Sequence, residues 1–428
     1  MNMDRILGGD PSVHCLGSTE DGWQMEIRDL VLSFLQRKNV LIETANANGT
    51  PLFLFEPDVM GERSRAFINA FSSHLEDFQA FFAMKCNNHP DVAREAVKAG
   101  LGLDVSSGLE LHTSLEIGCR RILFSGPGKT EKELELAAIN APRVTVLIDS
   151  FGELERLDAA ALKAGTTITA GVRLTTREEG LWRKFGIPLS SLGEFLSASA
   201  GKKAVRVRGL QFHTSWNLTP EAQVRFIEKL GKALGNMDPG LLQSLRFLDI
   251  GGGYWPEGGE WLLTGESPST PGAASLRGRE RLLTAPIGDF AREIAGALGK
   301  HIFPVAPLKI YAEPGRWIAD RIMHIMVSVA DRKADDLVIT DAGTNIIGWE
   351  RYETDYVPLI NLSRPSLTER PCLVAGSLCT PHDIWGWSYF GEGIEPGDIL
   401  ILPHQGAYTW SLHQQFIKPV AKVITIED

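Results

Sequence analysis

At 428 residues the chain is long enough for two hydrophobic cores, and its 43% hydrophobic and 22% charged residues are ordinary for a globular protein. The net charge of −10 argues against a nucleic-acid surface, because phosphate binding needs clustered Lys and Arg. No apolar run is long enough to cross a bilayer, and the charges within residues 1–30 argue against a signal peptide. We therefore expect neither a nucleic-acid partner nor a membrane partner.

Between residues 51 and 308, short apolar runs alternate with longer segments of helical period, the pattern of repeated β-α units. The eight expected strands are residues 52–55, 80–84, 102–105, 121–124, 144–148, 168–174, 209–212 and 246–250. Amphipathic stretches such as residues 90–99 and 131–139 are expected to cover them. This pattern predicts a TIM-like (β/α)8 barrel, an α/β fold.

After residue 308 the pattern changes to short β-like runs separated by Gly, Pro and Asp turns. These runs are residues 310–312, 324–330, 337–339, 371–374, 398–402 and 418–423. We expect a C-terminal β-sandwich or β-barrel domain over 309–428, a barrel over 51–308, and an N-terminal segment, 1–50, that contributes to the β-domain. The segment 251–286 sustains no period and is predicted to be a long surface excursion.

The five cysteines are scattered along the chain, with no CxxC pair and no His/Cys cluster. They are Cys15, Cys86, Cys119, Cys372 and Cys379. Neither a disulfide framework nor a metal site is expected, and a reducing cytoplasm is the predicted location.

Lys85 follows an apolar strand in the motif Phe82-Ala-Met-Lys85. A lysine that points into a barrel is desolvated, which lowers the pKa of its amine and suits it to form a Schiff base. For this motif alone, a strand-end lysine that reaches solvent is the commoner alternative.

Two further motifs suit the binding of an anionic ligand. Gly251, Gly252 and Gly253 follow a strand, and such a backbone can approach a phosphate and present its N–H groups. In Glu313-Pro-Gly-Arg316, a proline and a glycine hold a carboxylate and a guanidinium in fixed relation. Taken singly, a common glycine turn and a surface ion pair are the alternatives.

In this order the motifs resemble those of the fold-type III pyridoxal-phosphate decarboxylases, the family of diaminopimelate, ornithine and arginine decarboxylases. The other motifs that carry the resemblance are residues 103–108, residues 122–129, Phe212-His213, Asp341-Ala-Gly343, Cys379 with Asp383, and Gly406-Ala-Tyr408. The resemblance covers residues 51 to about 419. It implies an alanine racemase-like fold, pyridoxal 5′-phosphate as cofactor, and decarboxylation of an amino acid.

By that resemblance, Lys85 holds the cofactor aldehyde and Glu313 faces the pyridine nitrogen, where a carboxylate favours decarboxylation over racemisation. His213 stacks on the ring, and its alternative is a core histidine. Arg173 and Asp104 lie near the cofactor hydroxyl and the lysine, and a barrel-mouth salt bridge is the alternative for Arg173. The remaining implied cofactor contacts are Gly251, Gly252, Gly253, Gly315, Arg316 and Tyr408.

The resemblance also implies that Cys379 returns a proton to the substrate carbon from the partner subunit. A homodimer with active sites shared across its interface follows. The alternative for a free cysteine is a buried apolar filler.

The substrate side departs from the family pattern. The residue after Cys379 is acidic in the enzymes for diamines and diaminopimelate, where it holds a distal ammonium, but here it is Thr380. The other implied substrate contacts are Asp341, Arg351, His382 and Asp383, and Trp216 either shapes the pocket or packs in the core. We expect a conjugated amino acid as substrate, such as a citryl-diamino acid intermediate of siderophore biosynthesis.

Three alternatives stay open. The first is diaminopimelate decarboxylase of lysine biosynthesis, which Thr380 disfavours, and the second is a racemase. The third is a catalytically silent regulatory homologue. Such a protein should have lost some of the cofactor-binding residues, whereas this chain keeps them all.

Overall fold

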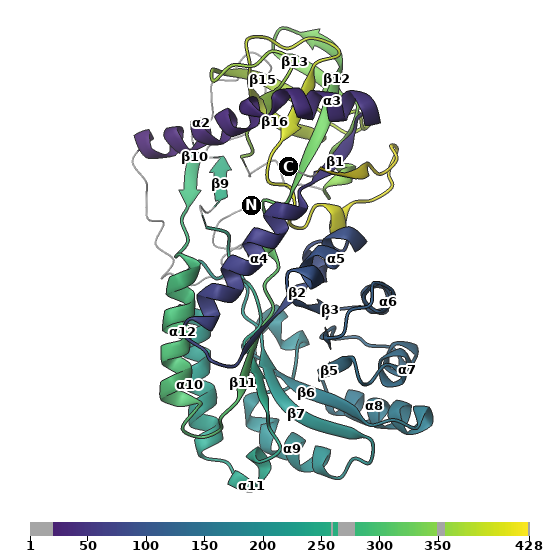
Figure 1. Ribbon diagram of the computed structural model, residues 1–428, viewed down its shortest axis with the longest axis vertical. Coiled ribbons are helices and arrows are strands. Elements are labelled where there is room, and N and C mark those ends of the chain that lie inside the picture. Colours follow the sequence, from purple (N-terminus) through teal and green to yellow (C-terminus); the bar gives the residue numbers. More distant parts are fainter. Residues whose placement is uncertain (1–19, 258–259, 264–278, 349–355, 427–428) are drawn as a thin grey trace. The chain divides into compact units, whose positions relative to one another are not determined.

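The computed structural model describes residues 20–257, 260–263, 279–348 and 356–426 (Figure 1). The chain divides into two compact units. The first, the barrel unit, comprises Met60–Glu257 and Ala285–Ile318. The second, the β unit, comprises Met1–Val59, Gly258–Thr284 and Ala319–Asp428. The chain therefore passes between the two units four times.

The barrel unit contains a closed parallel barrel, which confirms the predicted TIM-like fold. Its eight strands, in their order around the barrel, are β11 (Lys309–Ala312), β2 (Phe78–Ala83), β3 (Gly102–Val105), β4 (Ile122–Phe124), β5 (Val144–Ile148), β6 (Ile168–Leu174), β7 (Val205–Phe212) and β8 (Phe247–Asp249). Most of their residues are buried, as expected for strands packed on both faces.

Aromatic and aliphatic side chains fill part of the barrel interior. The cluster consists of Phe81, Leu123, Leu147 and Phe247, with the partly buried Tyr311 packed against it. The rings of Phe247 and Tyr311 stack with centroids 4.7 Å apart. Glycines on neighbouring strands leave space for these aromatic rings. A Cβ on Gly209 would lie 2.2 Å from the Phe247 ring, and one on Gly102 would lie 2.3 Å from the Phe81 ring. The interior is therefore a packed core.

Helices flank the barrel strands in Figure 1, and α10 and α12 pack side by side. The helices are α4 (Pro57–Ser72), α5 (Pro90–Lys98), α6 (Gly108–Glu116), α7 (Glu131–Ile139), α8 (Phe151–Ala164), α9 (Leu192–Ala200), α10 (Glu221–Gly235), α11 (Pro239–Leu242), α12 (Ile287–His301) and α13 (Arg316–Ala319). Their ends follow from local sequence: Thr130 and Glu133 form a capping box on α7, and Gly165 ends α8 in the left-handed conformation. None of the described helices is long and apolar enough to cross a membrane.

The β unit is built on an eight-stranded sheet with the order β13-β15-β16-β14-β17-β12-β1-β18. The strands are β1 (Leu52–Phe55), β12 (Met323–Ala334), β13 (Leu337–Thr340), β14 (Ile360–Asn361), β15 (Glu369–Ala375), β16 (Ile384–Phe390), β17 (Ile399–Leu402) and β18 (Lys422–Thr425). Strand β1 pairs antiparallel with β12 and parallel with β18. The first and last described strands of the chain are thus neighbours.

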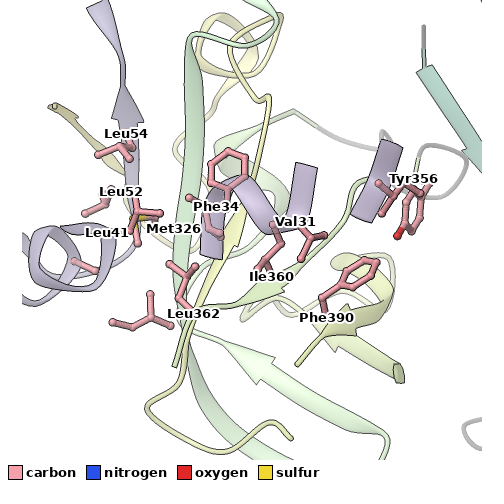
Figure 2. Close-up of a cluster of buried hydrophobic side chains, with 14 residues drawn as sticks. Val31, Phe34, Leu41, Leu52, Leu54, Met326, Tyr356, Ile360, Leu362 and Phe390 are labelled. Carbon is pink, nitrogen blue, oxygen red and sulfur yellow. The ribbon is translucent and has the colours of Figure 1, made fainter. Parts of the chain in front are cut away.

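Two N-terminal helices, α2 (Glu20–Gln36) and α3 (Lys38–Asn48), supply part of the β unit's core. Figure 2 shows Val31, Phe34 and Leu41 of these helices among side chains of the sheet. Leu52 and Met326, from the paired strands β1 and β12, belong to the same buried cluster. These helices therefore bury their apolar face within the β unit.

The segment 251–286 contains regular structure that its sequence did not predict. Strands β9 (Glu260–Leu263) and β10 (Arg279–Leu282) pair antiparallel. The guanidinium of Arg279 bonds to Glu369 and lies 3.7 Å from the ring centroid of Tyr356. The strands are short, and these side-chain partners of Arg279 are about 80 to 90 residues away in sequence. The local sequence pattern therefore could not predict the two strands. Residues 264–278 lie outside the described part of the chain.

Two strand assignments from the sequence were wrong. The chain passes between the units after Val59 and after Ile318, and not at the expected residues 51 and 308. Residues 52–55 were expected as the first barrel strand but form β1 of the β unit, and residues 310–312 were expected in the β-domain but lie in β11, which closes the barrel. Leu52 to Phe55 are all buried, and a fully buried apolar tetrad has the same pattern in a barrel and in a sandwich.

The described cysteines are free thiols. Cys86, Cys119 and Cys372 are buried and Cys379 is exposed, whereas Cys15 lies outside the described residues. Within the described ranges, no group of three or more His, Cys, Asp or Glu side chains is placed to hold a metal ion. The cytoplasmic location stays a prediction.

Candidate functional site

Polar residues gather at the carboxyl ends of the barrel strands, the face where barrel active sites are built. Lys85 follows β2, His213 follows β7, and Glu313 follows β11. The loop 251–253 follows β8, and its Gly252 lies against both His213 and Glu313. The barrel unit thus brings together most of the residues predicted to contact the cofactor.

Lys85 lies in a short 3-10 helix, η1 (Met84–Cys86), directly after β2. Its Nζ is 3.2 Å from Oδ2 of Asp104, which is fully buried on β3. The other carboxylate oxygen of Asp104 accepts a hydrogen bond of 2.5 Å from Ser125. Because the hydrogen bond from Ser125 fixes the Asp104 carboxylate, that carboxylate can orient the Lys85 amine.

Gly315 allows two turns to lie against each other. A Cβ at Gly315 would be 3.0 Å from Cβ of Cys86 and 3.3 Å from Cβ of Ala83. The carbonyl of Pro314 accepts a hydrogen bond of 3.0 Å from the N–H of Ala83. A Cβ at Gly315 would therefore be tightly packed between the Lys85 turn and the Glu313 turn, and a direct cofactor contact of Gly315 stays a prediction.

Glu313 is a buried carboxylate with polar neighbours. Its Oε2 is 3.4 Å from Nδ1 of His213, and its Oε1 accepts a hydrogen bond of 3.3 Å from Nε2 of Gln211. Burial alone would raise the pKa of Glu313, but the hydrogen bond with His213 and the charge of Lys85 outweigh it and lower the pKa well below the usual range. Glu313 is therefore ionised at neutral pH.

His213 has two contacts at one ring nitrogen. Nδ1 lies 3.2 Å from the N–H of Gly252 as well as 3.4 Å from Glu313. Burial lowers the pKa of His213 more than the hydrogen bond with Glu313 raises it, so the ring is neutral at pH 7. In the neutral ring, Nδ1 has two possible states. If it carries the proton, it donates a hydrogen bond to Glu313; if Nε2 carries the proton, Nδ1 accepts a hydrogen bond from the N–H of Gly252.

Two other buried carboxyl groups share this region. Burial and the negative charge of Glu313 raise the pKa of Asp104, although Lys85 and Ser125 act in the opposite direction. Burial, with the charge of Glu313 added, raises the pKa of Asp249 well above its usual value. Asp249 had no predicted role, although it begins the Asp-Ile-Gly-Gly-Gly motif. The pKa values of these two neighbouring carboxyl groups are thus shifted in opposite directions, and Glu313 ionises more readily than Asp249.

The glycine loop after β8 forms a cradle that no larger residue could occupy. Gly251 and Gly253 have φ values of +69° and +82°. A Cβ on Gly251 would lie 2.5 Å from the Phe212 carbonyl, and one on Gly253 would lie 2.2 Å from the Thr214 carbonyl. Glycine alone combines this conformation with this close approach.

Arg173, on β6, lies among charged and aromatic side chains. Its Nε is 4.0 Å from Oδ1 of Asp149, and its guanidinium lies 4.5 Å from the ring centroid of Phe185. Asp149 is buried, and that oxygen has no hydrogen-bond partner among the described residues. A contact with Asp149 fits the barrel-mouth ion pair, and the predicted cofactor contact of Arg173 stays a prediction.

The family model of the pyridoxal-dependent decarboxylases, for their pyridoxal binding domain, matches residues 62–320. The chain belongs to this family. The cofactor is pyridoxal 5′-phosphate, and the protein is an amino-acid decarboxylase, a carbon–carbon lyase.

Similar proteins agree with this assignment. The diaminopimelate decarboxylase of Methanothermobacter thermautotrophicus is 26% identical over 392 residues, which are 88% of this chain and 86% of that protein. The structure of a diaminopimelate decarboxylase of M. jannaschii has a TM-score of 0.75 at 21% identity, over 90% of this chain and 88% of the other. A lysine/ornithine decarboxylase of Vibrio vulnificus, complexed with putrescine, has a TM-score of 0.71 at 22% identity, over 91% and 98%. At these identities the two structures establish the fold.

The barrel residues suit the cofactor of this decarboxylase family. Gly251 and Gly253 let the loop pack closely against the backbone of residues 212–214 in a left-handed conformation, and such a glycine loop can present its N–H groups to a phosphate. Glu313 is buried and ionised, which suits a carboxylate opposite a protonated ring nitrogen. Lys85 is partly exposed and paired with Asp104, so its amine is accessible to an aldehyde. These observations fit a pyridoxal phosphate.

Arg316 begins α13 within the barrel unit, and the other predicted site residues of this decarboxylase belong to the β unit. Tyr408 is partly buried with φ of +58°, and Cys379 and His382 are exposed. Asp341 is half-buried, and its carboxylate accepts hydrogen bonds from Ser328 and Thr50. Their roles toward cofactor and substrate stay predictions. Arg351 lies outside the described residues.

Asp383 is held within its own loop, and its role as a substrate contact stays a prediction. Its side chain is 2% exposed, and its carboxylate accepts hydrogen bonds from the N–H groups of Thr344 and Leu378, at 2.7 and 2.6 Å. Asp383 also fills the space beside Gly376, where a Cβ would lie 2.2 Å from its Oδ2. The residue holds the turn that carries Cys379, and the motif alone could not distinguish this role from substrate binding.

Proposed function

We propose that the protein decarboxylates the amino-acid part of a larger conjugate, such as a citryl-diamino acid intermediate of siderophore biosynthesis. The loop after β15 carries the proposal. Its exposed or partly exposed side chains include Cys379, Thr380 and His382, and its one carboxylate, that of Asp383, is buried and bonded to the loop itself. A free diamino acid presents a distal ammonium, and a neutral loop offers it no balancing charge.

A second candidate is diaminopimelate decarboxylase. Curated proteins of that name match this chain along 82–90% of their own length. Their identities to this chain, 24–28%, leave room for a changed substrate. Thr380 is the residue that separates the two candidates.

Within the barrel unit, we propose that Lys85 holds the cofactor aldehyde and that Asp104 orients the amine. Glu313 would keep a proton on the pyridine nitrogen, and His213 would stack on the ring. Pyridoxal phosphate, when bound, accepts the electron pair that is left on the substrate carbon as carbon dioxide departs. A carboxylate that stays ionised at neutral pH supports this electron acceptance, because it favours the protonated ring.

For the phosphate we propose the glycine cradle 251–253, Arg316 and Tyr408. Backbone N–H groups and a guanidinium are the usual donors to such a dianion. Arg173 would contribute near the cofactor hydroxyl. These roles rest on the motif resemblance, and the positive φ values of Gly251 and Gly253 support the part played by the glycines.

We further propose a homodimer in which Cys379 of one subunit serves the Lys85 of the other. Cys379 is exposed, whereas the other described cysteines are buried. Its Sγ would give a proton to the substrate carbon that has lost carbon dioxide. A thiol held at the protein surface by the buried Asp383 is available to a second copy of the chain.

The deciding experiment measures carbon dioxide release by the purified holoenzyme. The substrates are lysine, ornithine, diaminopimelate and a citryl-diaminopropionate conjugate, with Lys85→Ala as the inactive control. We expect the conjugate to have the highest kcat/KM. Efficient release from free diaminopimelate, with none from the conjugate, would instead assign the protein to lysine biosynthesis.

A further inference from the structure

Two loops at the mouth of the barrel are joined by hydrogen bonds. The N–H of Asn217 donates to the carbonyl of Gly253 at 3.0 Å, and the N–H of Trp255 donates to the carbonyl of Asn217 at 3.3 Å. The buried side chain of Asn217 donates to Thr214 and to the carbonyl of Gly252. The segment 214–217 is therefore fixed to the phosphate cradle and its continuation.

This arrangement places two tryptophans against each other. Trp216 has a φ of +61°, a backbone conformation that residues other than glycine rarely adopt. Its indole stacks on that of Trp255, with centroids 5.2 Å apart and planes at 25°. The guanidinium of Arg316 lies 4.5 Å from the centroid of the Trp255 ring. The Trp255 ring is thus in contact with Arg316 and with Trp216.

The indole nitrogen of Trp255 lacks an acceptor. The side chain is 5% exposed, and Nε1 has no hydrogen-bond partner among the described residues. A buried donor without an acceptor is costly, so such a group in a native site suggests a ligand or a water that meets it. Trp255 lies two residues after the cradle and beside Arg316, both of which suit an anion.

We propose that Trp255 donates its Nε1–H to the phosphate of the cofactor, and that Trp216 holds the Trp255 ring in place. Trp255 is then a cofactor-binding residue, and Trp216 is a positioning residue. We choose the phosphate as the acceptor because a dianion strengthens the hydrogen bond from an indole. The contact involves the cofactor alone and does not depend on the substrate.

The test compares two forms of the cofactor on the apoprotein. Pyridoxal phosphate and pyridoxal differ only in the phosphate, and their dissociation constants are measured by equilibrium dialysis. Trp255→Phe keeps an aromatic ring and removes the N–H. We expect this variant to bind pyridoxal phosphate about tenfold more weakly, and to bind pyridoxal as the wild type does. Equal losses for both ligands, or no loss for either, overturn the proposal.

Variants of Trp216 test the positioning role. Trp216→Phe keeps a stacking ring and should bind pyridoxal phosphate within about twofold of the wild type, whereas Trp216→Ala should show a loss specific to the phosphorylated ligand. The phosphorus NMR shift of the bound cofactor should move in Trp255→Phe and Trp216→Ala and stay constant in Trp216→Phe. An unchanged shift in all three variants contradicts the phosphate contact.

A measurement on the unmutated chain guards against a variant that fails to fold. With 15N-labelled indoles, the Trp255 Nε1–H signal is assigned in the wild type by its nuclear Overhauser contacts with the ring of Trp216, which stacks on it. It should shift downfield when pyridoxal phosphate is added to the wild-type apoprotein and respond much less to pyridoxal. If both ligands shift the signal equally, the phosphate is not the acceptor. Loss of carbon dioxide release in these variants is not needed for either conclusion.

Discussion

Lys85 and Asp104 form an ion pair with 3.2 Å between Nζ and Oδ2, and the two side chains differ sharply in exposure. The Asp104 carboxylate is fully buried, whereas 36% of the Lys85 side chain is exposed. The buried partner is fixed by Ser125, so the amine is oriented while one side of it stays accessible. This geometry suits a lysine that exchanges between cofactor and substrate.

Replacement of Lys85 by alanine should abolish decarboxylation, because no other residue holds the cofactor aldehyde in the proposed site. We expect carbon dioxide release to fall by at least about a thousandfold. The bound cofactor should then be removable by dialysis and its visible absorbance should change. Lys98→Ala, at a lysine with a 71% exposed side chain on α5, is the matched control and should leave both properties unchanged. Retained activity in Lys85→Ala contradicts the assignment.

The buried carboxyl groups should give opposite pH effects on the stability of the apoprotein. The pKa of Asp249 is raised in the folded chain, so its contribution to stability is lost as the pH rises above its unfolded value of 3.8. Asp249→Asn mimics the protonated form and retains an oxygen for the N–H of Gly251. Its Tm relative to the wild type should therefore increase with pH.

Glu313→Gln should show the reverse. The pKa of Glu313 is lowered in the folded chain, so its stabilising contribution is present above the unfolded value of 4.5 and is lost as the pH falls through the folded pKa. The variant should be less stable than the wild type at pH 7, and the difference should shrink below about pH 4.5. Calorimetry of both variants from about pH 2.5 to 8 checks the two signs. Parallel pH profiles would falsify a protonated Asp249 beside an ionised Glu313.

Gly253→Ala should weaken cofactor binding, since its Cβ would lie 2.2 Å from the Thr214 carbonyl at a φ of +82°. The loop must then shift away from the Thr214 carbonyl, which changes the positions of its N–H groups. We expect the affinity for pyridoxal phosphate to fall about tenfold or more. Gly288→Ala is the control, because a Cβ there meets nothing within 4 Å. Similar affinities for the two variants would argue against the cradle.

Mixed dimers should reveal whether Cys379 acts across subunits. Lys85→Ala and Cys379→Ala should each be inactive or weakly active alone. A mixture in which the subunits have exchanged also contains hybrid dimers, with one subunit of each variant. About a quarter of the wild-type activity should return if the two residues come from different subunits. If each subunit supplied both residues, no hybrid would hold an intact pair and activity would not return. A sizing measurement establishes that the subunits exchange.

Thr380→Asp should shift the substrate preference. An aspartate in the loop after β15 restores a carboxylate for a distal ammonium, so kcat/KM for ornithine or diaminopimelate should rise about tenfold relative to that for the conjugate. Thr368→Asp adds the same charge at an exposed site elsewhere in the β unit and should have no such effect. Unchanged preference in Thr380→Asp would show that this residue does not face the substrate.

Much of the barrel could be predicted because each β-α unit contains its own local signals. The strand ends that carry Lys85, His213 and Glu313 follow apolar runs whose period is visible in the sequence. The pairing of β1 with β12 could not be predicted in this way, because it joins residues about 270 apart and the Leu52–Phe55 tetrad is buried on both faces.

Within the site, the motifs located residues but did not give their contacts. The resemblance grouped Asp383 with Cys379 and implied a substrate contact, but it did not indicate the bonds of Asp383 to Thr344 and Leu378. Trp255 was overlooked because a tryptophan after a glycine loop is indistinguishable from a core residue until its unpartnered nitrogen is seen. Hydrogen-bond satisfaction depends on three-dimensional neighbours, and no spacing in the chain records it.

The parallel pairing of β1 with β18 bears on how the chain is made. Residues 52–55 are synthesised about 370 residues before the neighbours with which they pair, residues 422–425. The barrel likewise lacks a closing strand until residues 309–312 are available. During synthesis the apolar tetrad of β1 therefore lacks its partner β18 until those roughly 370 further residues have been made, and over that interval it is a candidate binding site for a chaperone.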